Sequence, residues 1–267
     1  MTHLSYSQVD TLLSCGEKYR ITRIEGIQED PAWWLFGGSA VHAATEWHDL
    51  GDERTAEELF AQAMREQLEE APVGAPIRAS GRPSKEWTGG EDDAWWAHHG
   101  PNFVQNWMDW RKQNPNLILA PLPADVPAVE VQVGAVTPDG VALKGFIDRV
   151  FADQDTGDLL IVDLKTGKNN PGSSLQMDFY RYALTSTLNI TAHYGAFWMA
   201  RKGTFDAVHS LWRTDQQIED MLRKARILID NEMFIPHLSF LCSSCGVKEH
   251  CSAYTNLNRN QSNTTER

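Results

Sequence analysis

Two aspartates and a lysine stand at the ends of two apolar runs that resemble neighbouring strands. Asp163 follows Leu159-Leu160-Ile161-Val162, and a single residue separates it from Lys165. Asp148 closes the run Gly145-Phe146-Ile147. Carboxylates supply the hard oxygen ligands that Mg²⁺ or Mn²⁺ prefers, and an ammonium group beside them can stabilise charge on phosphorus. This combination predicts a metal-dependent hydrolase of phosphodiester bonds, that is, a nuclease.

The elements that must position these residues alternate between strand and helix patterns. A helix through Gln176 and Leu184 separates the third expected strand from the fourth, as in a crossover connection. The expected strands span residues 129–136, 141–151, 159–164, about 192–200 and 204–212. This order predicts an α/β fold with a mixed central sheet of the restriction-endonuclease-like type and flanking helices.

Further helices are predicted on both sides of the strands. Their expected ranges are Ser5–Tyr19 with Cys15 in its last turns, a helix that starts after Gly37-Gly38-Ser39 and carries His42, Glu46 and Leu50, then Thr55–Glu70, about 91–113 and about 215–231. Residues 71–90 are too rich in Pro, Gly and Ser for regular structure and predict a long loop, either a lid or a linker. The tryptophans of 91–113 are more typical of a core than of a base-stacking surface.

Composition limits the class of protein. The 267 residues, 42% of them hydrophobic, are sufficient for one large domain over 1–255, followed by a polar tail over 256–267. We find neither a membrane-spanning run nor a secretory signal, which predicts a soluble, cytoplasmic protein. The net charge of −12 lowers the expectation of tight nonspecific DNA binding, but the acid excess lies mostly in residues 1–100, outside the segment with the Asp/Lys motif.

The ordered motifs resemble those of the PD-(D/E)XK nucleases, and specifically the RecB-like exonuclease branch. The chain is similar to that branch at Gly38-Ser-Ala-Val-His42, Gly145-Phe-Ile-Asp148-Arg149, Val162-Asp163-Leu-Lys165-Thr166-Gly167 and Gln176-Met-Asp-Phe-Tyr180. The order and separations agree from Cys15 to Cys251. A lone Asp-x-Lys would be weak evidence, whereas ordered matches across most of the chain are specific.

The resemblance implies a role for each motif residue. The expected metal ligands are His42, Asp148, Asp163 and the backbone carbonyl of Leu164. A site with an imidazole ligand favours Mn²⁺ somewhat more than an all-oxygen site would. Lys165 is expected to position or deprotonate the attacking water. The other motif residues, Gln176 and Tyr180, share one side of a helix and are expected to place DNA and catalytic groups. Outside the motifs, Glu130 of the first expected strand is expected to bind the metal, to accept a hydrogen bond from a ligand, or only to face solvent.

Each of these residues also has a plain structural interpretation. Asp148 next to Arg149 is compatible with a surface ion pair, and Asp163 and Lys165 with two polar residues on an edge strand. A histidine such as His42 often only packs between helices. Candidate phosphate contacts outside the motifs are Lys168, Arg181, Arg201 and Lys202, whereas Glu46 and His48 match no motif and are expected to be solvated.

The four cysteines of the chain are Cys15, Cys242, Cys245 and Cys251. Four thiolates suit either a tetrahedral zinc ion, in which His250 could replace one cysteine, or a [4Fe–4S] cluster. Iron–sulfur members of the branch, including CRISPR-adaptation exonucleases and the nuclease domain of AddB, are similar in having one cysteine before the nuclease core and three after it. The resemblance therefore implies a structural [4Fe–4S] cluster that joins the two ends of the chain.

The predicted function is a DNA exonuclease that acts on strand ends, prefers single strands and uses Mg²⁺ or Mn²⁺. The end preference and the strand preference come from the resemblance alone. Alternatives are an endonuclease, an end-trimming nuclease of CRISPR adaptation, and a catalytically silent DNA-binding subunit of a recombination complex. DNA is the expected partner, and an oligomer or a recombination-complex partner is possible.

Overall fold

The computed structural model describes residues 3–71, 74 and 76–255, so the polar tail predicted over 256–267 lies outside the described residues. The chain divides into two compact units, one formed by residues 1–30, 136–143 and 219–267 and the other by 31–135 and 144–218. We call them the terminal unit and the sheet unit. No helix in the described part of the chain is long and apolar enough to cross a membrane.

The sheet unit is built on a mixed sheet, as the sequence predicted. The strands run in the order β1-β3-β4-β5-β6, and β2 also pairs with β3. β4 and β5 are parallel because α6 connects them, whereas β3 and β4 and likewise β5 and β6 are antiparallel. The bounds are β1 (Leu117–Leu119), β2 (Val129–Val136), β3 (Ala142–Asp153), β4 (Leu159–Lys165), α6 (Leu175–Leu188), β5 (Tyr194–Met199) and β6 (Thr204–Ser210). The α/β fold class is thereby confirmed.

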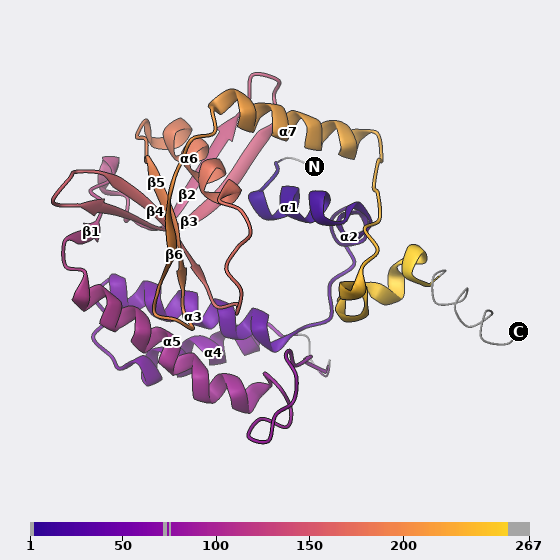
Figure 1. Ribbon diagram of the computed structural model, residues 1–267, viewed down its shortest axis with the longest axis horizontal. Helices are drawn as coiled ribbons and strands as arrows, with labels where there is room; N and C mark the ends of the chain where they lie inside the picture. The colour runs from indigo at the N-terminus through magenta and orange to yellow at the C-terminus, as the bar shows by residue number, and fades with distance from the viewer. Residues whose placement is uncertain (1–2, 72–73, 75, 256–267) are drawn as a thin grey trace, which may run out of the picture. The chain divides into compact units, whose positions relative to one another are not determined.

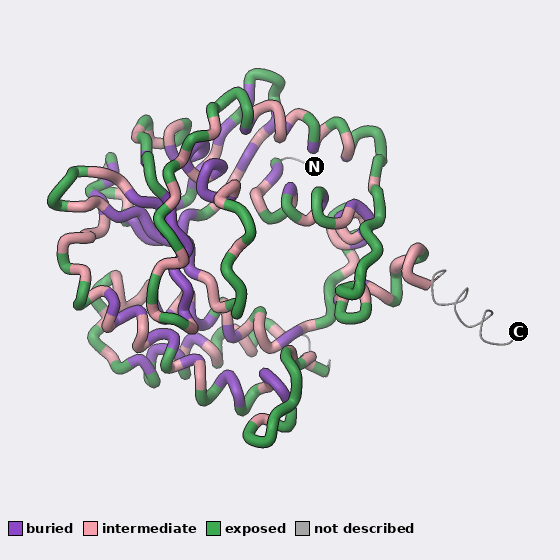
Figure 2. Tube along the Cα trace, in the orientation of Figure 1, coloured by how far each residue is buried: buried purple, intermediate pink, exposed green. Residues whose placement is uncertain are grey.

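One face of this sheet packs against three helices, α3 (Trp33–Asp49), α4 (Ala56–Glu69) and α5 (Asp93–Gln113), which form one layer beside the strands (Figure 1). Leu160, Val162 and Leu164 of β4 belong to the same buried cluster as Trp96 and Trp107 of α5. Side chains alternate along a strand, so Ile161 and Asp163 face the opposite side. Figure 2 shows the buried residues concentrated along these strands and the inner helix faces.

The opposite face is crossed by α6. Gly195 of β5 allows this contact, because a Cβ there would lie 2.8 Å from Met177 of α6. The neighbouring Ala196 is part of the cluster on the helical face. The two sides of β4 and β5 therefore differ, and Asp163 faces the layer that contains α6.

The predicted start of the second helix is wrong. α3 begins at Trp33 and runs through the glycines that were expected to precede it. A Cβ on Gly37 would lie 2.2 Å from the ring of Trp96, and one on Gly38 would lie 3.2 Å from Oγ1 of Thr166. These glycines allow α3 to approach α5 and the end of β4 closely, which matters more here than their low helix propensity.

In the terminal unit the expected helix Ser5–Tyr19 is interrupted. α1 (Tyr6–Ser14) ends at Cys15, which is extended, and α2 (Gly16–Tyr19) follows and continues into a π-helical turn (Arg20–Ile24). A Cβ on Gly16 would lie 2.5 Å from the backbone nitrogen of Ile235, and the amide of Gly16 donates to the Ile235 carbonyl. This contact holds Cys15 at the junction of two helices rather than within one.

The other helix predictions are close to the structure. α4 is capped by Thr55, whose side chain accepts from the amide of Glu58, and α5 contains all four expected core tryptophans. After β6 the described residues form α7 (Asp215–Asp230) and two 3₁₀ turns (Phe240–Ser244 and Lys248–His250), and a further 3₁₀ turn (Pro123–Asp125) lies before β2. The short strand β1 was not predicted, because its three residues are too few to show alternation.

Candidate metal and catalytic site

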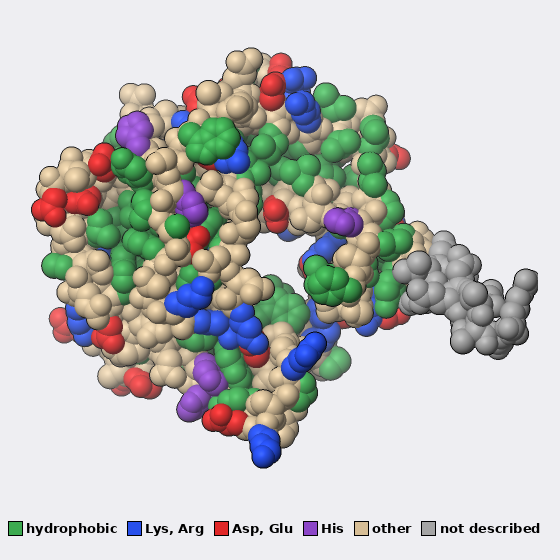
Figure 3. All heavy atoms as spheres, in the orientation of Figure 1, with side chains coloured by type: hydrophobic (Ala, Val, Ile, Leu, Met, Phe, Trp, Pro, Cys, Tyr) green, Lys and Arg blue, Asp and Glu red, His purple; other side chains and the backbone are tan. Residues whose placement is uncertain are grey.

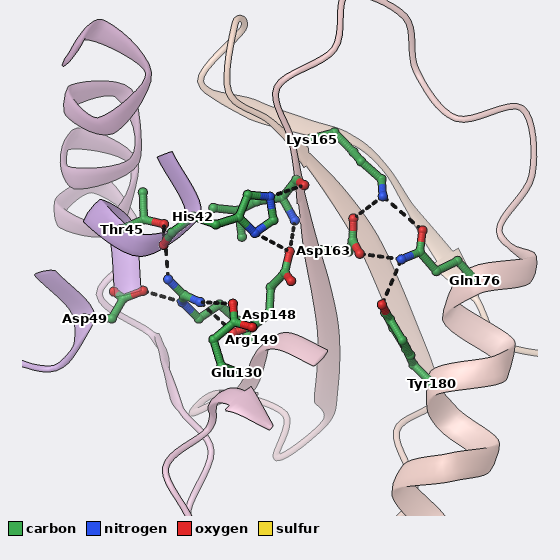
Figure 4. A network of polar contacts seen from close by, with 11 residues as sticks. His42, Thr45, Asp49, Glu130, Asp148, Arg149, Asp163, Lys165, Gln176 and Tyr180 are labelled. Atoms are coloured by element: carbon green, nitrogen blue, oxygen red, sulfur yellow. Dashed lines mark hydrogen bonds and ion pairs between the residues drawn. The ribbon is translucent and has the colours of Figure 1, made fainter. Parts of the chain in front are cut away.

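The motif residues of the sheet unit converge at the middle of β3 and the end of β4, beside α3 (Figure 4). The Asp148 carboxylate is fixed by the amide of Leu164, which donates to its Oδ2 at 2.6 Å. His42 spans the same pair of strands: Nε2 lies 3.1 Å from the Leu164 carbonyl oxygen and Nδ1 lies 3.4 Å from Asp148 Oδ2. Three of the four predicted metal ligands are therefore in mutual contact.

Glu130, for which the sequence left open a ligand role, a hydrogen bond to a ligand or a solvent-facing position, lies next to this group. One ligand atom each from His42, Glu130 and Asp148 lie within 4.8 Å of one another. Glu130 also adopts a positive φ of 47°, which costs a residue other than glycine about 1–3 kcal/mol and is typical of functional sites. Its Oε1 is buried, has no hydrogen-bond partner among the described residues, and lies 3.7 Å from Nη1 of Arg149.

The Asp163 carboxylate contacts two side chains, those of Lys165 and Gln176. Lys165 Nζ lies 2.7 Å from Asp163 Oδ2, and the amide nitrogen of Gln176 donates to Asp163 Oδ1 at 2.5 Å. Gln176 also accepts from Lys165 Nζ at 3.0 Å and donates to the Tyr180 hydroxyl at 2.9 Å. Asp163 is not within the 4.8 Å group, so a cation shared with that group would require its side chain to move away from Lys165 or Gln176.

The space for the Tyr180 ring depends on a glycine of the second motif. A Cβ on Gly145 would lie 3.3 Å from the Tyr180 ring, so a larger residue would press on it. Burial is the largest cause that raises the pKa of the Tyr180 hydroxyl far above its usual value, and the nearby acids add to it. Tyr180 therefore acts here as a neutral hydrogen-bond partner of Gln176.

The acids of the site differ in the direction of their pKa shifts. Burial opposes ionisation of Asp148, but the charge and hydrogen bond of His42 outweigh it, so the pKa of Asp148 is lowered. Burial, and next the charge of Asp148, raise the pKa of Asp163 to about 6 and that of Glu130 to about 7. For His42 burial favours the neutral ring, yet the charge of Asp148 raises its pKa to about 9. Such a site gains from a divalent cation that replaces these protons.

A buried ion pair that the sequence did not reveal holds α3 against β3. Arg149 is fully buried, not at the surface, and its Nε lies 2.5 Å from Oδ2 of Asp49. Its Nη1 donates to the carbonyl of Asp148 at 2.6 Å and its Nη2 to Oγ1 of Thr45 at 3.2 Å. The Thr45 hydroxyl in turn donates to the carbonyl of His42 at 2.9 Å. The surface-pair interpretation of Asp148 and Arg149 is therefore wrong.

A cavity of about 460 Å³ lies next to His42 and Glu130. Its lining comes from α3 and from the start of β2 and consists of Trp34, Leu35, Gly38, Ser39, His42, Ala43, Glu46 and Glu130. Glu46, expected to be only a solvated helix residue, is half-buried at this cavity. The donors of the site, one imidazole and several carboxylate and carbonyl oxygens, suit Mg²⁺ or Mn²⁺.

The remaining phosphate-contact candidates differ in availability. Arg181 is buried, and its guanidinium donates to Asp215 and to the carbonyl of Arg213. Arg201 donates to the carbonyl of Thr166 and to Glu91. Lys168 and Lys202 are exposed.

In the terminal unit the four cysteines line a single cavity. Its other lining residues are Lys18, Ile21, Pro236, His237, Leu238, Val247, Lys248 and Tyr254, so His250 is not part of the lining. The amide of His237 donates to Sγ of Cys15 and the amide of Ser239 to Sγ of Cys242, each at 3.4 Å. The structure thus brings Cys15 together with the C-terminal triplet.

Comparisons with known proteins agree with the motif order. The chain is similar to the Gene 69 protein of Mycobacterium phage D29, with 30% identity covering 70% of this chain and 71% of the relative. The Gene 69 protein of Mycobacterium phage L5 is 26% identical, over 74% of this chain and 76% of the relative. These names carry no information about activity.

A crystal structure of protein VC1899 from Vibrio cholerae has a TM-score of 0.24 and 12% identity, covering 86% of this chain and 57% of that one. That likeness is too slight to support any argument. In contrast, the family model of the PD-(D/E)XK nuclease superfamily matches residues 3–252. The chain therefore belongs to the PD-(D/E)XK nuclease superfamily.

Proposed function

We propose that this protein is a metal-dependent DNA exonuclease that hydrolyses phosphodiester bonds at strand ends, prefers single strands and carries a structural [4Fe–4S] cluster. Superfamily membership supports the nuclease activity and DNA as substrate. The preference for ends and for single strands is supported by the resemblance of the motifs to the RecB-like branch.

One observation carries the nuclease proposal: the residues of four motifs, far apart in the sequence, meet at one place in the sheet unit. His42 reaches Leu164 and Asp148, and on the other side of β4 Lys165 and Gln176 reach Asp163 (Figure 4). A catalytically silent module has no need for a half-buried imidazole, two acids and an amine together.

The chain's own residues suggest how hydrolysis proceeds. His42, Asp148, Asp163 and the Leu164 carbonyl are the residues that would hold Mg²⁺ or Mn²⁺, with Glu130 as a further ligand. When bound, a divalent cation polarises the phosphoryl oxygen and lowers the pKa of water.

Lys165 supplies the positive charge beside the reacting phosphate. Gln176 fixes its ammonium group, because the amide oxygen accepts from Lys165 Nζ while the amide nitrogen donates to Asp163. Held in this way, Lys165 can orient the attacking water and stabilise the charge that develops on phosphorus.

For the cysteines, the cavity of the terminal unit that all four of them line supports a shared metal centre. Four thiolates suit either a tetrahedral zinc ion or a [4Fe–4S] cluster. The resemblance to the iron–sulfur members of the RecB-like branch favours the cluster.

The activity can be tested on labelled linear DNA and on closed single-stranded circles with Mn²⁺ or Mg²⁺. We expect the linear strand to be shortened from an end and the circle to survive. The Asp163→Ala variant should lose cleavage, whereas Asp155→Ala, which removes an exposed acid from the turn before β4, should retain it.

Two other results would redirect the proposal. Cutting of the circle would show an endonuclease and would remove the end preference. Binding of DNA without any cleavage, with either metal, would favour the silent DNA-binding subunit and would contradict the enzyme proposal.

A further inference from the structure

Residues 78–91 of the loop between α4 and α5 make several contacts within the sheet unit. Ser80 and Glu91 form an antiparallel bridge, and the amide of Glu91 donates to the Ser80 carbonyl at 2.7 Å. Within the loop the amide of Ser84 donates to the carbonyl of Trp87 at 2.9 Å. The Trp87 ring packs on His99 of α5, with centroids 5.1 Å apart. The loop is therefore fixed at its base.

Glu91 attaches this loop to the segment that follows the catalytic lysine motif. Its side chain is 9% exposed and lies 2.8 Å from Lys168 and 3.0 Å from Arg201. Arg201 also donates to the carbonyl of Thr166 at 2.7 Å. Because Thr166 directly follows Lys165, the loop, the end of β4 and the turn after β5 lie side by side.

Three segments that meet here have a charge opposite to that of the whole chain. Residues 78–91, 165–170 and 200–203, which we call the basic face, contain seven Lys or Arg and two acids, in a chain with 24 Lys or Arg and 36 Asp or Glu. The basic residues are Arg78, Arg82, Lys85, Lys165, Lys168, Arg201 and Lys202, and the acids are Glu86 and Glu91. Figure 3 shows several Lys and Arg side chains close together near the lower centre of the view, with others elsewhere on the same face.

Several of these cations are available to a ligand. Arg82, Lys85 and Lys202 are exposed, and the Lys168 side chain is 59% exposed. Lys168 Nζ lies 3.4 Å from the position that a Cβ on Gly81 would occupy, so this ammonium group is adjacent to the loop. Positive groups thus continue from the reacting centre at Lys165 out to the loop.

We propose that the basic face binds the phosphate backbone of the DNA strand next to the scissile bond. This inference rests on the proposed nuclease function and adds the surface that holds the substrate. A DNA strand that passes Lys165 meets these cations in succession. Phosphate contacts of this kind position a DNA strand without reading its base sequence. The fixed base of the loop keeps its cations in one place while the strand is bound.

The test uses the Arg82→Glu/Lys85→Glu variant and a fluorescently labelled single-stranded oligonucleotide without added divalent cation, so that the strand stays intact. We expect Kd at about 0.1 M salt to rise at least ~10-fold, and the slope of log K against log salt to fall in magnitude by about 1.4, or 0.7 per lost contact. In cleavage assays KM should rise while kcat at saturating DNA stays unchanged.

The matched control is Arg65→Glu/Lys112→Glu, which makes the same change in net charge at exposed positions. Lys112 lies at the opposite end of α5, roughly 28 Å along the helix axis from Asp93 at 1.5 Å per residue. We expect its Kd to change less than about twofold. Arg82→Gln/Lys85→Gln should show a smaller loss of affinity with an unchanged Tm, which separates binding from folding.

The outcomes distinguish this inference from the nuclease proposal. Wild-type affinity and salt slope in the Arg82→Glu/Lys85→Glu variant would overturn the proposed DNA-binding role of the basic face, even if the protein cuts DNA. Equal losses in the loop variant and in the control would also overturn it, since net charge alone would then explain both. A loss confined to the loop variant supports the basic face, even in a protein that cuts nothing.

Discussion

Gln176 is the residue on which the geometry of the reacting groups depends most directly. Its amide oxygen accepts from Lys165 while its amide nitrogen donates to Asp163 and Tyr180. We predict that Gln176→Leu lowers kcat about 100-fold, because Lys165 loses its fixed position, with a smaller effect on DNA affinity. Single-turnover cleavage measures this. Tyr180→Phe removes only the outermost contact, so a loss as large as that of Gln176→Leu would contradict this account.

Glu130 gives a prediction with a defined pH dependence. Folding raises its pKa from 4.5 to about 7, mainly through burial. Because the carboxyl ionises at lower pH in the unfolded state than in the folded state, it destabilises the folded, metal-free protein. This destabilisation grows from pH 4.5 to pH 7 and is constant above pH 7. Glu130→Gln should therefore raise the metal-free free energy of unfolding at pH 8 by about 1–3 kcal/mol, and by much less near pH 5.

The same variant should bind Mn²⁺ about 10- to 100-fold more weakly if Glu130 is a ligand. Urea unfolding without metal and calorimetric titration with Mn²⁺ measure the two effects independently. Unchanged Mn²⁺ affinity would contradict the ligand role, and an equal gain in stability at pH 5 and pH 8 would contradict the assigned pKa.

At the scale of elements, α3 is the helix whose placement decides the metal site. Asp49 accepts from both Arg149 and Arg111, at 2.5 and 3.2 Å, but only Arg149 also bonds Thr45 and the carbonyl of Asp148. Removing either arginine leaves Asp49 with the other arginine and with the indole N–H of Trp107, which donates to Asp49 Oδ2 at 3.1 Å. One charged partner of a buried carboxylate is lost in each case, so each →Met variant should lose a few kcal/mol of stability.

Only Arg149→Met should also weaken Mn²⁺ binding, by about 10-fold or more, because it removes the hydrogen bonds that connect Thr45, beside His42, to the Asp148 carbonyl. Arg111→Met is the matched control, with a similar expected loss of stability measured by urea unfolding. Equal Mn²⁺ affinities of the two variants would show that Arg149 has a purely structural role.

Local sequence patterns predicted the strands and most helices well, because strand alternation and helical spacing are local signals. They failed where a distant partner decides the structure. Gly37 and Gly38 suggest a break, but the Trp96 ring and Thr166 require glycine inside α3. Arg149 looked like a surface residue because its partner, Asp49, lies 100 positions away.

In the candidate site, the specific order of the motifs singled out residues that the structure brings together, whereas for Glu130 the sequence left several roles open and did not indicate its close approach. Its positive φ of 47° depends on the sheet around it and leaves no signal in the sequence. Asp163 was correctly placed beside Lys165, but its firm contact with Gln176 could be seen only in the structure.

At the scale of the whole molecule, the cysteine cavity connects segments from both ends of the chain. A link from Cys15 to Cys242 closes a loop of more than 200 residues. The chain-entropy estimate for a crosslink of this length is about 5 kcal/mol. Cys15→Ser should therefore lower Tm by about 10 °C.

Protein purified without oxygen should contain about four irons and four sulfides per chain, and Cys15→Ser should contain markedly less. Ser14→Ala, one residue away, is the control and should keep the full iron content. A zinc-loaded, iron-free wild type would contradict the cluster, while leaving the nuclease activity of the sheet unit to be judged separately.

The most direct test of the central claim is an anomalous-scattering map of crystals soaked in Mn²⁺. The account predicts a peak about 2.0–2.4 Å from His42 Nε2, Asp148 and the Leu164 carbonyl, with Asp163 or Glu130 completing the ligands. Absence of a peak there at saturating Mn²⁺, or a peak bound by other residues only, would contradict it.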